Sequence, residues 1–342
     1  MTDRQAPASF EEIRRLIAEL PGPDKEAESA AVLRQSQLLK PAGALGRLEE
    51  LAAWLAAWQG GQPRLERPHI AVFAGNHGIA ARGVSAYPPE VTRQMVATFI
   101  DGGGAVNQLA AETGAELRVY ELALEQPTAD FSEAPAMDEE GCLRAMAYGM
   151  MAVEEGFDVY ALGEMGIGNT TSAAALAHAL HGGRAADWVG HGTGIDAERL
   201  AHKTALVEAA VARHRPALTD GLEVLRHLGG FELAAIAGAV LAARLARVPV
   251  LLDGYATTAA AACLGALDPR LLDHCQVAHR SVEPGHAHLL EALGKRPLLD
   301  LDMRLGEASG AALAIQVLKA ATACHNGMKT FAEAGVSGPA EG

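Results

Sequence analysis

The chain has 342 residues and a net charge of −14, a length that allows a substantial hydrophobic core and about two domains. Apolar residues make up 49% and aromatic residues only 4%, so Ala, Leu and Val must form the core, as in helix-rich α/β enzymes. The acidic balance excludes nucleic acids and anionic membranes as partners, because both require a basic face. An anionic ligand must therefore be bound by a few local groups.

Cysteine usage and hydropathy together predict a cytoplasmic protein without a membrane span. Residues 1–5 lack the basic start and apolar run of a signal peptide. The most apolar long segment, 233–252, contains Arg244 and Arg247, which predicts a buried helix followed by a strand. No CxxC spacing occurs, so neither a disulfide framework nor a zinc ribbon is expected from Cys142, Cys263, Cys275 and Cys324.

In chain order, the first predicted elements are helices within residues 8–59, interrupted by a Pro/Gly hinge in Lys40–Glu49. Residues at helical spacing form one apolar face there: Leu48, Leu51, Trp54, Leu55 and Trp58. A buried strand is predicted at His69–Ala74, followed by a glycine turn, a loop and a helix over Val91–Phe99.

Later strands alternate with helical patterns, and a last helix is predicted over Leu305–His325. This alternation is typical of a Rossmann-like α/β fold, a parallel sheet with helices on both faces. The later strands are predicted at Glu116–Leu122, Phe157–Leu162, Val248–Asp253 and Gln276–Arg280.

The expected architecture is an α/β domain flanked by a small helical subdomain built from both ends of the chain. Ligand sites in such sheets lie beyond the carboxyl ends of the strands, where the turns at Gly75, Gly163 and Gly254 fall. We expect these turns to converge on one cleft. The predicted limits are 1–65 and 305–335 for the helical subdomain, 66–304 for the α/β domain, and 336–342 for a disordered tail.

The turn between Gly163 and Leu176 is the most informative motif, because it lies between a predicted strand and an alanine-rich helix. Its glycines would let the backbone approach a phosphate at the positive end of that helix. A carboxylate would repel phosphate, so Glu164 should face a cationic or hydroxylated part of the ligand. The candidate ligand-binding residues are Glu164, Gly166, Gly168, Asn169, Thr170 and Thr171.

An ordinary helix start remains an equal alternative for this turn, with Asn169 or Thr170 as the N-cap. The motif matches neither of the standard phosphate patterns, since no GK[ST] follows and the glycines do not read GxGxxG. Asp187 lies near the spacing of a dinucleotide-fold ribose acid. However, it precedes a predicted strand starting at Trp188, which weakens that match.

A second glycine turn at Gly192, Thr193 and Gly194, with Lys203 in the helix after it, could hold a phosphate from the other side. The alternative is that Lys203 is solvated, as most of the 28 basic residues are.

Glu307 is the candidate catalytic group, because small residues beside it leave room for a ligand. A flat aromatic ligand and apolar walls would raise the pKa of Glu307 and make it a general base near neutral pH. The alternative is a first-turn glutamate that stabilises the helix dipole. No metal site is expected in the histidine-rich stretch, which lacks the spacing of a tetrahedral site. A loop over the cleft or an interface is expected for His274, Cys275, His279, His286 and His288.

Six collinear segments resemble the nicotinate-nucleotide:dimethylbenzimidazole phosphoribosyltransferases of cobalamin lower-ligand synthesis. Together they span most of the chain. The resemblance implies a Rossmann-like domain, a small domain of helices from both termini, a homodimer, and no cofactor or metal. The segments are Lys40–Glu49, Ala74–Val96, Gly163–Thr171, Leu251–Ala261, His279–His286 and Met303–Leu313.

The resemblance implies that Glu307 takes a proton from 5,6-dimethylbenzimidazole while the other ring nitrogen attacks C1′ of nicotinate mononucleotide. Nicotinate leaves and α-ribazole 5′-phosphate forms. Glu164 and Lys203 match positions near the ribose and phosphate, and both glycine turns would cradle the phosphate. The remaining implied substrate-binding residues, the first three of them in the segment that contacts the base, are Tyr87, Gln94, Met95, Arg304 and Leu305.

Asn76 departs from the family, in which many members have Asp before the His-Gly pair, and this could alter the base preference. Three other functions stay open from the residues alone. They are an NAD-dependent oxidoreductase, a noncatalytic nucleotide-binding sensor and, less favoured, a phosphoribosyl pyrophosphate-dependent transferase, for which no paired-acid loop is found.

Overall fold

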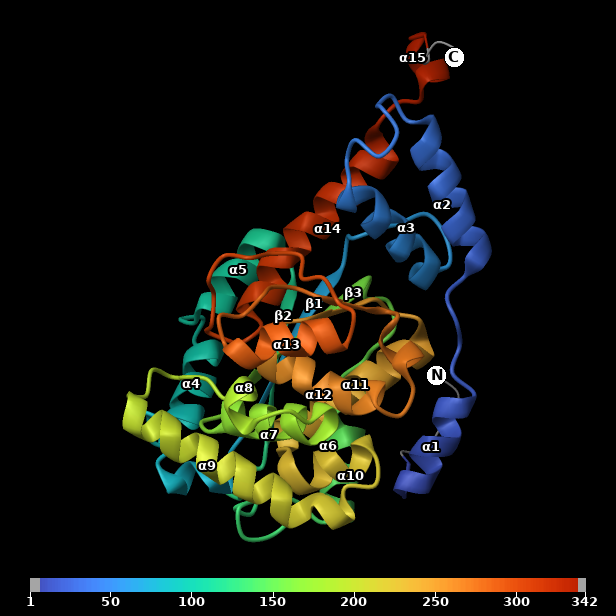
Figure 1. Ribbon diagram of the computed structural model, residues 1–342. Helices are drawn as coiled ribbons and strands as arrows, with labels where there is room; N and C mark the ends of the chain where they lie inside the picture. Colours follow the sequence, from blue (N-terminus) through green and yellow to red (C-terminus); the bar gives the residue numbers. More distant parts are fainter. Residues whose placement is uncertain (1–6, 338–342) are drawn as a thin grey trace.

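The computed structural model describes residues 7–337, in which five parallel strands form one sheet in the order β2-β1-β3-β4-β5 (Figure 1). Every neighbouring pair of strands runs parallel. The predicted α/β fold class is therefore confirmed. The strands are β1 (Pro68–Gly75), β2 (Glu116–Leu122), β3 (Val159–Met165), β4 (Val250–Leu252) and β5 (Cys275–Val277).

Strand β1 shows why the sheet is buried on both faces. Its residues contribute alternately to two hydrophobic clusters, with Ala71 and Phe73 on one face and Ile70 and Val72 on the other. This is the two-residue period of a strand, and every residue of β1 is buried. The edge strand β2 is mostly half-exposed, as a strand with one neighbour can be.

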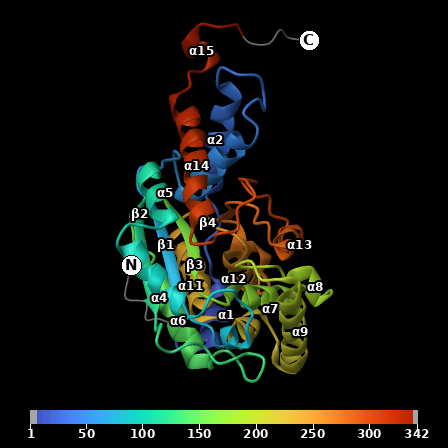
Figure 2. The ribbon, with the colours of Figure 1, turned by 90° about the vertical axis from the view of Figure 1, so that its left-hand side faces the viewer.

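Helices cover both faces of the sheet (Figure 2). The larger core cluster joins one face to α6 (Glu139–Met151), α7 (Asn169–His181), α10 (Gly221–Leu228), α11 (Phe231–Ala246) and α12 (Tyr255–Gly265). The second cluster joins the other face to α3 (Arg47–Gln59), α4 (Glu90–Ile100), α5 (Ala105–Thr113) and α14 (Ser309–Gly327). The other helices are α1 (Phe10–Ala18), α2 (Lys25–Gln37), α8 (Ala185–Trp188), α9 (Ala197–His214), α13 (Pro284–Ala292) and α15 (Phe331–Ala334), with short 3₁₀ turns η1 (Gly78–Arg82), η2 (Arg215–Ala217) and η3 (Pro269–Leu272).

Two sequence predictions need correction. No strand begins at Trp188, because this residue ends helix α8, and the Asp187 carboxylate pairs with Arg184 of the same turn. The last long helix begins at Ser309 rather than at residue 305, so the segment carrying Glu307 is irregular backbone. Within residues 7–337, no helix has the length and hydropathy needed to span a membrane.

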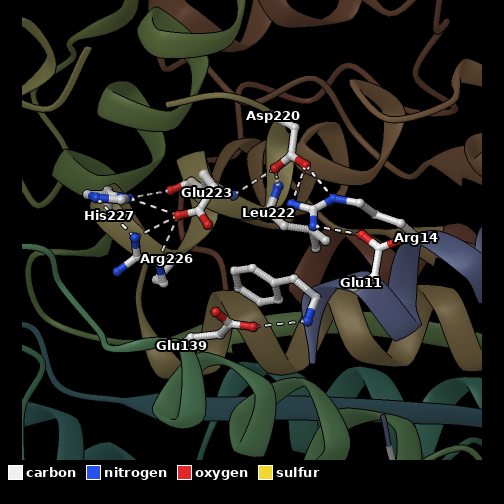
Figure 3. A network of polar contacts seen from close by, with 9 residues as sticks. Glu11, Arg14, Glu139, Asp220, Leu222, Glu223, Arg226 and His227 are labelled. Carbon is white, nitrogen blue, oxygen red and sulfur yellow. Dashed lines mark hydrogen bonds and ion pairs between the residues drawn. The ribbon is translucent and has the colours of Figure 1, made fainter. Parts of the chain in front are cut away.

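Helices α2, α3, α14 and α15 project together from one end of the sheet, whereas α1 lies apart from them (Figure 1). Phe10 and Ile13 of α1 belong to the larger core cluster. Arg14 forms an ion pair with Asp220, the N-cap of α10 (Figure 3), and the two side chains are 2.7 Å apart. The backbone N–H of Phe10 donates to the Glu139 carboxylate. Helix α1 therefore packs on the α/β domain, whereas the sequence predicts it within the helical subdomain. The exact limits of the domains remain a prediction. The predicted tail lies mostly outside the described residues.

Candidate active site

The candidate site lies at the carboxyl ends of β1, β3 and β4, where the sequence placed its glycine turns. A Cβ atom at Gly166 would lie 2.6 Å from the carbonyl oxygen of Gly75, so the turns after β3 and β1 are in contact. A Cβ at Gly163 would lie 2.1 Å from the backbone nitrogen of Ala308, which only glycine permits. The turns after these strands and the Glu307 segment therefore meet at one place.

The start of α7 is the candidate phosphate site. Its N-cap is Gly168, at a φ of 99°, and no side chain caps the helix within the described structure. The predicted N-cap role for Asn169 or Thr170 is thus wrong, because both residues lie inside the helix. The backbone N–H groups of Asn169 and Thr171 donate to the carbonyls of Gly166 and Gly168, and the positive end of the helix attracts an anion. The turn itself is fixed by Thr92 of α4, whose hydroxyl oxygen accepts from the backbone N–H of Ile167 at 3.1 Å.

A buried histidine–glutamate pair packs against this turn. His77 Nε2 lies 2.6 Å from Glu232 Oε1, and both side chains are fully buried. His77 Nδ1 also lies 3.1 Å from the hydroxyl of Ser172, in the first turn of α7. A Cβ at Gly166 would lie 3.3 Å from the His77 ring, so the ring packs directly against the turn.

Glu164 is the penultimate residue of β3, and its side chain reaches the first residue of α7. Its carboxylate accepts a hydrogen bond from the side chain of Asn169. Burial raises the pKa of Glu164 well above its usual range, and the nearby carboxylates of Asp253, Glu232 and Glu307 add to the increase. Such a site favours a ligand that brings positive charge.

Glu307 is held in an unusual conformation between β3 and α14. Its φ is 61°, and its backbone N–H donates to the carbonyl of Glu164 at 3.1 Å. Burial and, to a smaller extent, the charge of Asp253 together raise the pKa of the Glu307 carboxyl to about 7. The residue precedes Ala308, the N-cap of α14, so the alternative of an ordinary first-turn glutamate is wrong.

Lys203 of α9 is fully buried, so the alternative of a solvated lysine is also wrong. Its amino group donates to the Thr170 hydroxyl at 2.9 Å and to the Gly190 carbonyl at 3.1 Å. Burial lowers the pKa of Lys203 to about 8, while the carboxylate of Glu283 acts to raise it. The lysine thus joins the start of α7 to the second glycine turn.

The second turn already has a protein partner at Gly192. Its backbone N–H donates to Glu283 Oε1 at 2.8 Å, and its carbonyl accepts from Arg304 at 3.0 Å. The hydroxyl oxygen of Thr193 accepts from the backbone N–H of Ala86. A cleft of about 390 Å³ lies beside these groups, lined by His191, Gly194, Ile195, Val282, Glu283, Pro284 and Arg304. Phosphate binding by Gly192–Gly194 remains a prediction.

The predicted base-contacting residues Tyr87, Gln94 and Met95, and the predicted substrate-binding residue Leu305, have side chains that are open to solvent or half-buried. Tyr87 and Leu305 are each 54% exposed, which is unusual for side chains of their size. Gln94 is exposed on α4, and Met95 packs against the cluster that contains Met165. Their contact with a base remains a prediction.

The histidine-rich stretch does not form one loop over the cleft, because part of it lies in β5 and α13; its predicted place at an interface remains a prediction. His274, His279 and His286 are buried, as is Cys275. His286 lies in α13 and accepts from the backbone N–H of Ser281, whereas His288 is exposed. Within residues 7–337, no group of three or more His, Cys, Asp or Glu side chains is arranged to hold a metal ion.

Sequence reasoning missed several buried polar residues of the site. Asp253 directly follows β4 and is fully buried, which an acidic residue after an apolar strand could have indicated. The others give no local signal in the sequence, because their partners come from distant segments: His77, Glu232, His279 and Glu283. Asn76 donates through its side-chain amide to the Leu124 carbonyl at 2.8 Å.

Comparison with known proteins gives matches over nearly the whole chain. The family model DBI_PRT, described as phosphoribosyltransferase, matches residues 20–336. A nicotinate-nucleotide–dimethylbenzimidazole phosphoribosyltransferase of Rhizobium etli is 56% identical over 329 residues, covering 96% of this chain and 97% of the relative. The same-named protein of Methylocella silvestris is 56% identical over 336 residues, covering 98% of each. The crystal structure of CobT from Thermus thermophilus has a TM-score of 0.86 and 45% identity, covering 92% of this chain and all of that one.

Proposed function

This chain belongs to the nicotinate-nucleotide–dimethylbenzimidazole phosphoribosyltransferase family, and we propose that it moves the phosphoribosyl group of nicotinate mononucleotide to 5,6-dimethylbenzimidazole, with Glu307 as general base. The observation that carries the proposal is the buried Glu307 carboxyl with its pKa near neutrality, beside a helix start suited to phosphate. A base with such a pKa is matched to proton transfer at physiological pH.

In this reaction Glu307 removes the N–H proton of the benzimidazole as the other ring nitrogen bonds to C1′ of the ribose. The bond from C1′ to the nicotinate nitrogen breaks, and its electron pair stays on that nitrogen. The pyridinium is thereby neutralised, so no general acid is needed. Attack opposite to the leaving group converts the β-nucleotide into an α-riboside. The proton on Glu307 then passes to solvent.

The buried carboxylates of Glu164, Asp253 and Glu307 support a cationic reacting centre. The substrate carries a pyridinium, and positive charge spreads to the ribose as the glycosidic bond breaks. Negative groups fixed in a poorly solvated site stabilise that charge in the transition state. The raised pKa of Glu164 reflects the same field, because burial and neighbouring acids oppose its ionisation until a cation is present.

Phosphate binding is assigned to the start of α7 and to Lys203. Thr170 and Lys203 lie 2.9 Å apart there, which supplies a hydroxyl and an ammonium group beside the helix N–H groups. We further propose that the protein is a cytoplasmic homodimer and uses Tyr87, Gln94, Met95, Arg304 and Leu305 against its substrates. The alternative function of an NAD-dependent oxidoreductase relies on Asp187 as the acid that binds a ribose. Asp187 lies instead in α8 and pairs with Arg184, so this alternative is not favoured.

The test is an assay of the purified chain with nicotinate mononucleotide and 5,6-dimethylbenzimidazole, in which nicotinate and α-ribazole 5′-phosphate are separated and identified by mass. We expect Glu307→Gln to bind the nucleotide but to lose on the order of a hundredfold or more in kcat. Glu140→Gln, an exposed change on α6, serves as control and should act like wild type. Nucleotide binding without turnover by wild type would favour the sensor instead.

A further inference from the structure

The backbone that carries Glu307 is left-handed over three successive residues. Gly306, Glu307 and Ala308 have φ values of 79°, 61° and 59°. A non-glycine residue in this region costs on the order of 1–3 kcal/mol, so surrounding contacts must hold two such residues in place. A Cβ at Gly306 would lie 2.4 Å from Glu164 Oε1, so the segment also needs a glycine at that position.

Asp253 is the side chain that secures the end of this segment. Its Oδ1 accepts a hydrogen bond from the backbone N–H of Ala311 at 2.8 Å, in the first turn of α14. Burial raises the pKa of Asp253, whereas the charge of His279 and the backbone N–H groups of Ala311, Gly310 and Ala308 act to lower it and so favour the ionised form. Asp253 follows β4 directly, so it ties the helix behind Glu307 to the central sheet.

The hydrogen bond to α14 uses only Oδ1 of the Asp253 carboxylate and gives no role to Oδ2. The side chain is fully buried, and Oδ2 has no hydrogen-bond partner among the described residues. The nearest opposite group is His279, whose Nε2 lies 3.7 Å from Oδ1. A buried, half-satisfied carboxylate destabilises a fold, and its retention beside a catalytic carboxyl points to an electrostatic purpose.

We propose that Asp253 is a positioning residue for the transfer reaction: it fixes the left-handed segment that carries Glu307, and its charge makes Glu307 a stronger base. The proposal rests on the proposed function of Glu307. Like charges at a shared buried site disfavour a second ionisation, so the Asp253 carboxylate strengthens the affinity of Glu307 for a proton. This agrees with the direction in which Asp253 shifts the pKa of Glu307.

Other charged groups around Glu307 do not replace Asp253. Glu164 reaches the site from the end of β3, and Glu232 acts on Glu164 from α11. His279, from the segment after β5, faces Asp253 and partly offsets its charge. Arg304 precedes Glu307 but is exposed and bonds to Gly192. No neighbouring group therefore replaces the charge of Asp253, and we expect its removal to make Glu307 a weaker base.

The test is Asp253→Asn, which keeps an oxygen for the Ala311 amide and removes the charge. In this variant the pKa of Glu307 should be lower by about half a unit or more. Carbon NMR of protein labelled with ¹³C-glutamate measures this pKa, and Glu307→Gln identifies the Glu307 signal. The acid limb of kcat/KM should shift to lower pH by the same amount. At high pH, kcat should fall on the order of tenfold, because the base is weaker and less well held.

Asp158→Asn is the matched control, since Asp158 is also buried and accepts from the backbone N–H groups of Glu66 and Arg67, but at the amino end of β3. It should lower stability without moving the titration. If Asp253→Asn does not fold, Asp253→Ser replaces it. An unchanged Glu307 titration in the folded variant would overturn the proposal. Because NMR needs no turnover, this outcome is distinct from absence of activity in wild type.

Discussion

The buried amino group of Lys203 lies 2.9 Å from the hydroxyl of Thr170 and 3.1 Å from the Gly190 carbonyl. This contact joins α9 to the first turn of α7, so one cation bridges the two glycine turns of the candidate site. A buried lysine with only neutral oxygens as direct partners is poorly stabilised as a cation, and the pKa of Lys203 falls to about 8 as a result. A phosphate would supply the missing counter-charge.

Lys203→Met should therefore weaken binding of the nucleotide more than it slows the chemical step. We expect KM for nicotinate mononucleotide to rise on the order of tenfold to a hundredfold, since a charge-assisted contact to phosphate is lost. Lys295→Met is the matched control. Its amino group also donates to two carbonyls, those of Leu272 and Cys275, but it lies at the amino end of β5. Equal kinetic effects of both changes would contradict the phosphate role.

The pH dependence of kcat/KM should be bell-shaped with a narrow maximum. Glu307 must be ionised to accept a proton, so activity rises as pH increases through its pKa of about 7. Lys203 must be protonated to bind phosphate, so activity falls as pH increases through its pKa of about 8. Free-enzyme groups set this profile. Steady-state rates between pH 5 and 10 check it, and a flat profile from pH 5 to 7 would exclude Glu307 as the base.

Glu307→Gln should also make the folded chain more stable at alkaline pH. The pKa of Glu307 is higher in the folded than in the unfolded state, so its favourable contribution is complete below pH 4.5 and disappears as pH rises through about 7. The amide has no such dependence. Between pH 5 and pH 8, the variant should therefore gain about 2 to 3 kcal/mol relative to wild type. Urea denaturation at both pH values measures this, and Glu140→Gln should show no such gain.

Asn76→Asp should destabilise the chain, although the family resemblance leads one to expect aspartate at this position. The Asn76 amide donates to the Leu124 carbonyl at 2.8 Å in a buried position, and an ionised carboxylate cannot donate. The expected loss is about 1 to 3 kcal/mol and is larger at pH 8 than at pH 5, because protonation restores a donor.

The control for this change is Asn326→Asp, which alters an equivalent amide-to-carbonyl hydrogen bond to Pro63 at an exposed position. Water can replace that donor, so the loss should stay within about 0.5 kcal/mol. Urea denaturation of both variants gives the comparison. If the two losses are equal, the buried bond of Asn76 has no special importance.

The sequence predicts the positions of the strands better than it predicts which side chains contact one another in the site. Every strand of the sheet is predicted to within a few residues, and for β1, β3 and β4 the signal is an apolar run buried on both faces. Strand β2 at the edge is mostly half-exposed and carries a weaker signal of this kind. The start of α14 is predicted four residues too early, since Leu305 and Glu307 also suit a helix. Contacts with residues far away in the chain hold this segment outside the helix: Glu307 donates to the Glu164 carbonyl, and Arg304 donates to the Gly192 carbonyl.

Site residues are predictable where they lie at the end of a strand or after a glycine turn, as Glu164 and Thr170 do. Pairs assembled from distant segments are not. His77 and Glu232 are 155 positions apart, and no pattern within either segment indicates the other. The same limit applies to Gly192 and Glu283, which are 91 positions apart.

The contact between Gly163 and Ala308 also bears on how the protein is synthesised. Strand β3 has been synthesised once about half of the chain is made. The segment around Ala308 that packs against it is synthesised nearly 150 positions later. Until then the carboxyl ends of β3 and β4 are uncovered, and the buried acids face water with ordinary proton affinity. A chain truncated before this segment would lack both Glu307 and α14, which packs against one face of the sheet, and we expect it to be inactive.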